Sequence, residues 1–301
     1  MNRTLVPVET GWVPWNGRRL YYEVHGSGQE TTVLLHGLLV SSAMNRQFAS
    51  NLARRGHRIV LLDLLGHGKS DRPEHASEYR FDVYTEQVLA LLDHLDVPRA
   101  VVGGVSLGAN VALLFATLHP DRVGGLVVEM PVLEWAVPSA ALTFVPLLLG
   151  AHYARRPLRP ITDLCSRLPR TGRAVDSLLD ALSTRPEAAS AILHGILVGP
   201  VAPTVDARHG ISAPTLVIGH RADLIHPFSD AENLTEQIPN ARLVRGWFPF
   251  GMRIIPDRLL DAVASFLDDL DDLDDLGAGP VSPPTIDERE EHHGFRAQET
   301  P

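Results

Sequence analysis

A serine between two glycines is the residue in this chain whose type and surroundings best suit nucleophilic chemistry. Residues 103–108 read GGVSLG, which places Ser106 in a G-x-S-x-G pattern. An apolar run precedes the pattern, and an alanine- and leucine-rich run follows it. A tight strand-to-helix turn here would lift the hydroxyl above a sheet and aim helix N–H groups at a developing negative charge. The pattern and its flanks therefore predict a serine nucleophile.

A nucleophilic serine ordinarily needs a histidine to take its proton and an acid to orient that histidine. The segment HRADLIHP (220–227) offers Asp223 and, three residues later, His226. If this loop turns, both side chains face Ser106, and His226 is the general base that Asp223 orients. Two plainer readings stay open. His226 could cap a helix that starts near Pro227, and Asp223 could serve only the shape of its loop.

Two further residues compete for these roles. His220, directly after an apolar run, is a less favoured substitute base. Glu129 closes another apolar run and is either an alternative acid or a residue that satisfies local backbone groups.

The segment LLHGLLVSS (34–42) is a second catalytic signal. A His-Gly pair at the end of a strand is typical of a loop that contributes an N–H group to an oxyanion hole. By position, the two donors are the backbone amides of Leu38 and Leu107. His36 is read as a residue that packs this loop, and we do not assign it as a base.

Short β-branched runs alternate with helical patterns, which predicts a mostly parallel sheet with helices on both faces. The strands are expected near 19–24, 31–37, 57–63, 99–104, 122–130, 214–219 and 241–246. Helices are expected near 44–55, 82–95, 107–118, 229–237 and 256–270. Residues 131–210 are helical, rich in proline and without strands, and would cover the C-terminal edge of the sheet as a cap.

On these residues the chain resembles the α/β-hydrolase superfamily from about residue 18 to 267. DLLGHGKSDRP (63–73), HPDRVGGLVVEMP (119–131) and APTLVIGHRADLIHP (213–227) look like further family segments, and the last carries the triad aspartate over to Asp223. The resemblance implies an α/β fold with a mostly parallel eight-stranded sheet and a helical cap. Its divisions would be 1–130 and 211–267 for the core, 131–210 for the cap and 268–301 for an acidic disordered tail. His67 and His119 match positions that the family uses structurally.

The family places its histidine in the loop after the eighth strand, and this chain departs from that pattern. The loop reads WFPFGMRII, with Met252 after Gly251 and Arg253 as its only cationic side chain. Some actinobacterial members of the superfamily look similar there. Loss of the base from a serine triad costs ~10⁴–10⁶ in rate. Two functions are therefore weighed: a hydrolase acting on an ester or thioester of a hydrophobic acyl or aromatic molecule through acyl-Ser106, and a non-catalytic binder of a small apolar ligand.

Charge and composition limit the partners. The 301 residues carry a net charge of -9, and the segment from Asp268 onward accounts for all of it, so the body is formally neutral and nucleic-acid binding has no support. The single cysteine, Cys165, suits a reducing compartment. No signal-peptide pattern and no apolar run of membrane-spanning length is seen, so a cytoplasmic protein is expected. No cofactor and no metal are expected, and the oligomeric state is left open.

Arginines gather in the expected cap. Six lie between residues 155 and 173, with Asp163 as the one acidic residue among them. They form either a solvated basic face or a patch that attracts anionic head groups or carboxylates.

Overall fold

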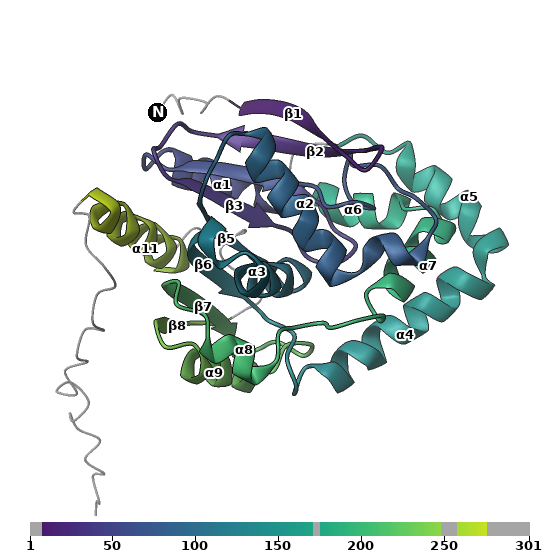
Figure 1. Ribbon diagram of the computed structural model, residues 1–301. Coiled ribbons are helices and arrows are strands. Elements are labelled where there is room, and N and C mark those ends of the chain that lie inside the picture. Colours follow the sequence, from purple (N-terminus) through teal and green to yellow (C-terminus); the bar gives the residue numbers. More distant parts are fainter. Residues whose placement is uncertain (1–7, 171–174, 248–257, 276–301) are drawn as a thin grey trace, which may run out of the picture.

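An eight-stranded sheet lies at the centre of the computed structural model, which describes residues 8–170, 175–247 and 258–275 (Figure 1). The strands are β1 (Val8–Trp15), β2 (Arg18–His25), β3 (Thr31–Leu35), β4 (Arg58–Leu62), β5 (Ala100–Val105), β6 (Val123–Glu129), β7 (Thr215–His220) and β8 (Ala241–Gly246). Their order in the sheet is β1-β2-β4-β3-β5-β6-β7-β8. β1 and β2 are antiparallel to their neighbours, and the other pairs are parallel. The expected α/β class and mostly parallel eight-stranded sheet are confirmed.

β1 is the strand that the apolar runs did not predict. It pairs with β2 along its full length, from Val8 opposite His25 to Trp15 opposite Arg18. The two strands are joined by Asn16 and Gly17, which both have positive φ angles. An Asn-Gly pair of this kind forms the two-residue turns that match the twist of a hairpin. This dipeptide was the sequence signal for the missed strand.

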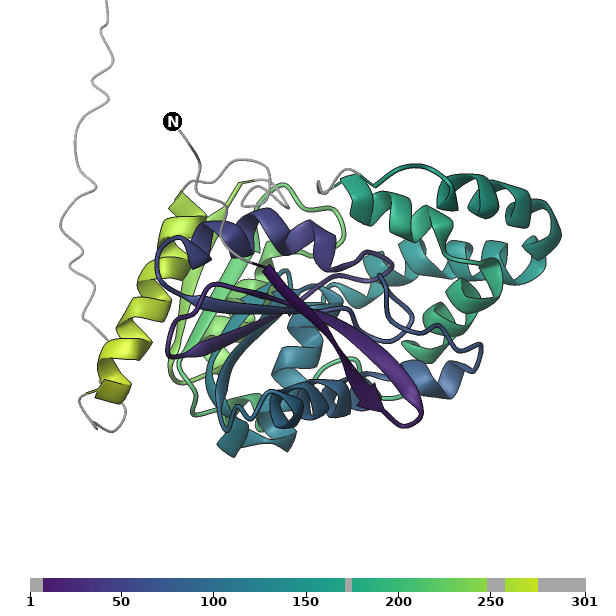
Figure 2. The same cartoon turned by 90° about the horizontal axis from the view of Figure 1, so that it is seen from above.

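Helices cover both faces of the sheet because alternate strand residues point to opposite sides. On one face, α1 (Arg46–Ala53) and α11 (Arg258–Asp275) pack on residues such as Leu34, Leu61 and Val127. On the other, α2 (Phe81–His94), α3 (Leu107–Leu118) and α9 (Phe228–Gln237) pack on residues such as Val33 and Val102. The layered arrangement is visible in Figures 1 and 2.

The segment between β6 and β7, which we call the cap segment (residues 131–210), contains only helices among its described residues. They are α4 (Val137–Tyr153), α5 (Arg155–Ser166), α6 (Val175–Ser183), α7 (Pro186–Gly195) and α8 (Val205–His209). α6 packs on the short helix η1 (Ser42–Asn45) after β3, and α7 packs on η2 (Ala76–Tyr79) after β4. The cap segment therefore meets the loops at the C-terminal edge of the sheet.

Two helical features bear on the expected tail and on membranes. α11 continues to Asp275, beyond the expected end at 270, and buried Leu270 extends its apolar face onto the sheet beside Gly125. Among the described residues, no single helix is long and apolar enough to cross a membrane. α4 and α5 meet that test only when taken together, and they are bent by 101° at their junction.

A buried ion pair joins β2 to the start of α1 and so fixes the loop between β3 and α1. The Glu23 carboxylate, 3% exposed, accepts hydrogen bonds from the Arg46 guanidinium at 2.7–3.1 Å and from the His25 ring at 3.4 Å. Burial alone would raise the pKa of Glu23, but the hydrogen bonds from His25 and Arg46 outweigh it and lower this pKa to about 2.

Glu23 should make the fold sensitive to acid. Its pKa in the folded chain lies below the ordinary value of 4.5, so the stabilisation is complete above about pH 4.5 and is lost as the pH falls toward 2. The loss is on the order of 3 kcal/mol. In urea unfolding between pH 7 and pH 3, Glu23→Gln should be less stable than the parent at pH 7 and should show a smaller decline. Glu9→Gln, an exposed change on β1, is the control. An unchanged decline in Glu23→Gln would contradict this assignment.

Candidate functional site

Ser106 lies at a strained turn between β5 and α3. Its φ of 53° and ψ of -109° are values that a residue with a side chain rarely adopts. The turn can form because Gly104 and Gly108 lack side chains: a Cβ on Gly108 would lie 2.7 Å from Leu35, and one on Gly104 would lie 2.6 Å from Gly108. Ser106 is partly exposed, so its hydroxyl is presented above the sheet.

Asp223 and His226 lie beside Ser106, in the loop between β7 and α9. The Nε2 atom of His226 is 2.9 Å from Ser106 Oγ, and its Nδ1 atom is 2.9 Å from Asp223 Oδ2. With an N–H at Nδ1, the ring donates to the aspartate and accepts from the serine hydroxyl. The structure thus brings together the three residues that the sequence proposed as nucleophile, acid and base.

Hydrogen bonds among residues 223–226 give this loop its shape. Asp223 Oδ1 accepts the backbone N–H groups of Ile225 at 2.8 Å and His226 at 3.0 Å. This turn directs the Asp223 and His226 side chains toward each other, while Pro227 leads into α9. Burial alone would raise the pKa of Asp223, but hydrogen bonds from the His226 ring and from these two backbone groups outweigh it, so this pKa is lowered.

The loop that carries Leu38 is held by buried polar groups on either side. His36 donates from Nδ1 to the carbonyl of Gly37 at 2.8 Å and accepts the N–H of Leu64 at Nε2 at 3.1 Å. Burial lowers the pKa of His36 and keeps the ring neutral. Both ring nitrogens are thus engaged, in agreement with a packing role. Asp63 holds the far end of the loop by accepting the N–H of Ser42 at 2.8 Å.

The expected oxyanion donors come from two different elements. Leu107 is the first residue of α3, so its N–H has no acceptor within the helix. Leu38 lies two residues beyond the anchored His36, in the loop after β3. The two residues therefore follow the C-terminal ends of the neighbouring parallel strands β3 and β5.

His220 and Glu129 form a separate buried pair. His220 Nε2 is 3.0 Å from Glu129 Oε1, at the ends of the neighbouring strands β7 and β6. His67 is also buried and donates from Nδ1 to the carbonyl of Leu65 at 3.0 Å. Among the histidines that the structure describes, His226 is the one hydrogen-bonded to Ser106. Met252 and Arg253, in the loop where the resemblance implied a histidine, lie outside the described residues.

Two polar residues that the sequence did not single out tie the cap segment to the site. The Asn110 side chain forms hydrogen bonds with both ends of the cap segment. It donates to the carbonyls of Val132 and Val201 and accepts the N–H of Val132. Asp230 is fully buried on α9 and accepts backbone N–H groups just before α4, among them that of Leu133 at 3.0 Å. Burial raises the pKa of Asp230 despite these bonds. A lone asparagine in the apolar helix LGANVALLFATL was the available signal for Asn110.

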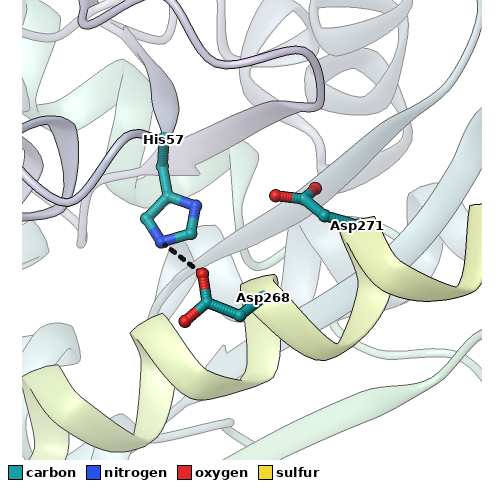
Figure 3. A group of neighbouring side chains, drawn as sticks. All are labelled: His57, Asp268 and Asp271. Carbon is teal, nitrogen blue, oxygen red and sulfur yellow. Dashed lines mark ion pairs between the residues drawn. The ribbon is translucent and has the colours of Figure 1, made fainter. Parts of the chain in front are cut away.

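One group of described side chains has the types and spacing to ligate a metal ion. His57, Asp268 and Asp271 have ligand atoms that lie within 4.8 Å of one another (Figure 3). His57 precedes the N-terminal end of β4, whereas Ser106 follows the C-terminal end of β5, so the group lies at the opposite edge of the sheet. His57 also has an ion-pair partner, since its Nε2 is 3.5 Å from Asp268 Oδ1. This ion pair links α11 to the residue that precedes β4.

Comparison with known proteins agrees with this geometry. Residues 32–151 match the family model of the alpha/beta hydrolase fold. A 2-hydroxy-6-oxononadienedioate/2-hydroxy-6-oxononatrienedioate hydrolase from Pseudomonas putida is 30% identical over 245 residues, which cover 75% of this chain and 82% of that one. An uncharacterized protein of Mycobacterium tuberculosis is 29% identical over 278 residues, which cover 84% of this chain and 79% of that one.

Solved structures show the same fold. The enol-lactonase from Burkholderia xenovorans LB400 superimposes with a TM-score of 0.66 at 23% identity, covering 86% of this chain and 99% of that one. The strand order, the serine turn after β5 and these similarities agree with one another, and the chain belongs to the α/β-hydrolase fold family.

Proposed function

We propose that the protein is a serine hydrolase that cleaves an ester or thioester of a hydrophobic acyl or aromatic small molecule through an acyl-Ser106 intermediate. The observation that carries the proposal is the 2.9 Å contact between His226 Nε2 and Ser106 Oγ, with Asp223 on the other ring nitrogen. A serine hydroxyl needs such a base to become a nucleophile near neutral pH.

The reaction follows from this arrangement. Ser106 Oγ attacks the acyl carbon while His226 Nε2 takes the hydroxyl proton, and the amides of Leu38 and Leu107 donate to the oxyanion. His226 then returns the proton to the leaving alcohol or thiol. Water attacks the acyl-Ser106 ester by the same route, which releases the carboxylic acid and restores the serine.

Partly buried apolar side chains of the cap segment and of the loop after β3 support a hydrophobic acyl group. Phe144 and Leu148 on α4 and Leu38 and Leu39 in the oxyanion loop are partly buried and pack against the same apolar core. Apolar surface of this kind favours acyl chains and aromatic rings over charged groups.

Hydrolysis of a carbon–carbon bond is a second candidate, and the similarity to the Pseudomonas putida enzyme favours it. The compound in that enzyme's name contains no ester or thioester, so its hydrolysis must break a carbon–carbon bond. Paired assays decide between the candidates: kcat/KM for p-nitrophenyl acyl esters of increasing chain length against kcat/KM for 2-hydroxy-6-oxo-dienedioates. We expect the esters to be the better substrates. A preference for the dienedioate of 100-fold or more would replace the first candidate by the second.

A non-catalytic binder, the remaining alternative, would have no need of an activated serine. A fluorophosphonate probe reports on activation directly. We expect the parent protein to be labelled and Ser106→Ala not to be labelled. His226→Ala should lose labelling because the serine then has no base, with a fall in kcat of ~10⁴–10⁶. Circular dichroism would verify that each variant is folded.

His209→Ala, an exposed change on α8, is the matched control and should label like the parent. Undiminished labelling in His226→Ala would exclude His226 as the base. Absence of labelling in the folded parent would favour the binder.

The pH profile of kcat/KM should show no loss of activity from protonation of Asp223 within the usual carboxyl range. Because the pKa of Asp223 is lowered, its carboxylate stays ionised as the pH falls below the usual carboxyl range. Asp223→Asn should reduce kcat by ~10⁴. An acid limb of kcat/KM within the usual carboxyl range that Asp223→Asn abolished would contradict the lowered pKa of Asp223.

A further inference from the structure

Exposed apolar side chains are concentrated in the cap segment. Among the described residues, fifteen of the twenty large apolar side chains that are exposed lie between 131 and 210. Leu142 and Tyr153, both on α4, are each 80% exposed. Exposed apolar surface gathered in one part of a protein marks a site of interaction. The rest of the described surface shows only scattered apolar residues, which need no explanation.

The exposed residues form a stripe on α4 opposite the side that packs. Leu142, Val145, Leu149 and Tyr153 are spaced three and four residues apart, so they share one side of the helix. Phe144 and Leu148 lie on the other side and pack on the core. α4 is thus apolar on both sides, with one side left uncovered. Ile161 and Leu164 continue the exposed apolar residues on α5 at the same spacing.

The same helices carry positive charge. From residue 135 to 170 the chain has five arginines and one acidic residue, Asp163. Arg159 and Arg170 pair with Glu187 and Asp180, which lie on other cap helices. Arg156 and Arg167 are exposed and have no carboxylate within ion-pair distance in the described part of the chain. Exposed arginines beside apolar side chains suit an interface that is apolar inside and anionic at its edge.

Negative charge lies at the other end of the molecule. α11 carries Asp261, Asp268 and Asp269, which pair with Arg55, His57 and Arg242, and also Asp271 and Asp272. Figures 1 and 2 both show this helix on the side away from α4 and α5. An anionic surface would therefore repel the α11 end and attract the cap. This separation of charge would orient the molecule before contact.

We propose that the exposed face of α4 and α5, the cap face, docks onto an anionic lipid surface. The apolar stripe would enter the boundary between head groups and acyl chains, and the arginines would contact lipid phosphates. Because α4 and α5 are bent by 101°, they would lie along the surface and not cross it. A second copy fits less well, since two cap faces would bring arginines against arginines.

Vesicle co-sedimentation tests the docking. With vesicles of phosphatidylcholine containing about 30 mol% phosphatidylglycerol, the protein should bind, and binding should weaken in high salt. Vesicles of phosphatidylcholine alone should bind it at least about tenfold less. Leu142→Gln/Leu149→Gln should lose binding, and Arg156→Gln/Arg167→Gln should lose the dependence on phosphatidylglycerol. Leu118→Gln on α3, where the side chain is 50% exposed and so comparable to Leu149 at 49%, is the control and should bind like the parent.

Three results would overturn the docking. They are equal binding to both kinds of vesicle, full binding by Leu142→Gln/Leu149→Gln, and a dimer in light scattering that this double variant abolishes. In the last case the cap face joins two copies of the chain. All these residues are exposed, so the variants should keep the parent's melting temperature. Ser106→Ala should bind vesicles like the parent, which separates a failure of docking from a failure of the proposed reaction.

Discussion

A single carboxylate organises the proposed active site. Asp223 uses one oxygen to accept two backbone N–H groups of its own loop and the other to accept the His226 ring. The first set of bonds shapes the turn, and the second selects the ring tautomer that leaves Nε2 free to accept from Ser106. The proposed acid and base are therefore three residues apart and are positioned by one local turn. No separate loop is needed to bring the imidazole to the serine.

The other half of the site depends on close approach of backbone segments. The turn at Ser106 holds a strained conformation that two glycines make possible, since a Cβ at Gly108 would collide with the end of β3. Strain of this kind persists only when the surroundings hold it in place. Here the carbonyl of Glu129 on β6 accepts the Ser106 N–H at 2.9 Å, and His36 and Asp63 anchor the neighbouring oxyanion loop. One edge of the sheet therefore supports both the proposed nucleophile and the proposed oxyanion donors.

The cap segment is tied firmly at its ends and exposes apolar surface beyond them. Asn110 and Asp230 bond its ends to α3 and α9, close to Ser106 and to the loop of Asp223. Ser139 on α4 adds a bond to the carbonyl of Ile225 at 2.7 Å. A change in the position of α4 would therefore be transmitted by direct contacts to the turn that carries Asp223 and His226. Suppose that the cap face docks on lipid and that the protein hydrolyses a hydrophobic acyl compound. The apolar substrate and the proposed catalytic serine would then lie on the same side of the protein.

Local patterns in the sequence predicted much of the scaffold. The alternation of β-branched and helical runs indicated the sheet and its flanking helices, and GGVSLG between a strand and a helix indicated the turn at Ser106, because backbone sterics act over a few residues. Strand β1, which was missed, ends just before an Asn-Gly pair. This local turn signal was present in the sequence but was not used. The last helix runs past its expected end at 270 to Asp275, and the sequence pattern did not predict this extension.

The two candidate bases, His220 and His226, are distinguished by the tertiary structure. The sequence favoured His226 as the base but left His220, at the end of β7, as a second candidate. The difference between them is direction: His220 is the last residue of its strand and its ring meets Glu129 on the neighbouring strand, whereas the turn after Asp223 brings His226 back over the sheet to Ser106. Residue types and spacing thus determined which groups were available for catalysis. Only the packed chain decided which of them meet, because hydrogen bonds act over about 3 Å and residues 120 positions apart are brought that close by the fold alone.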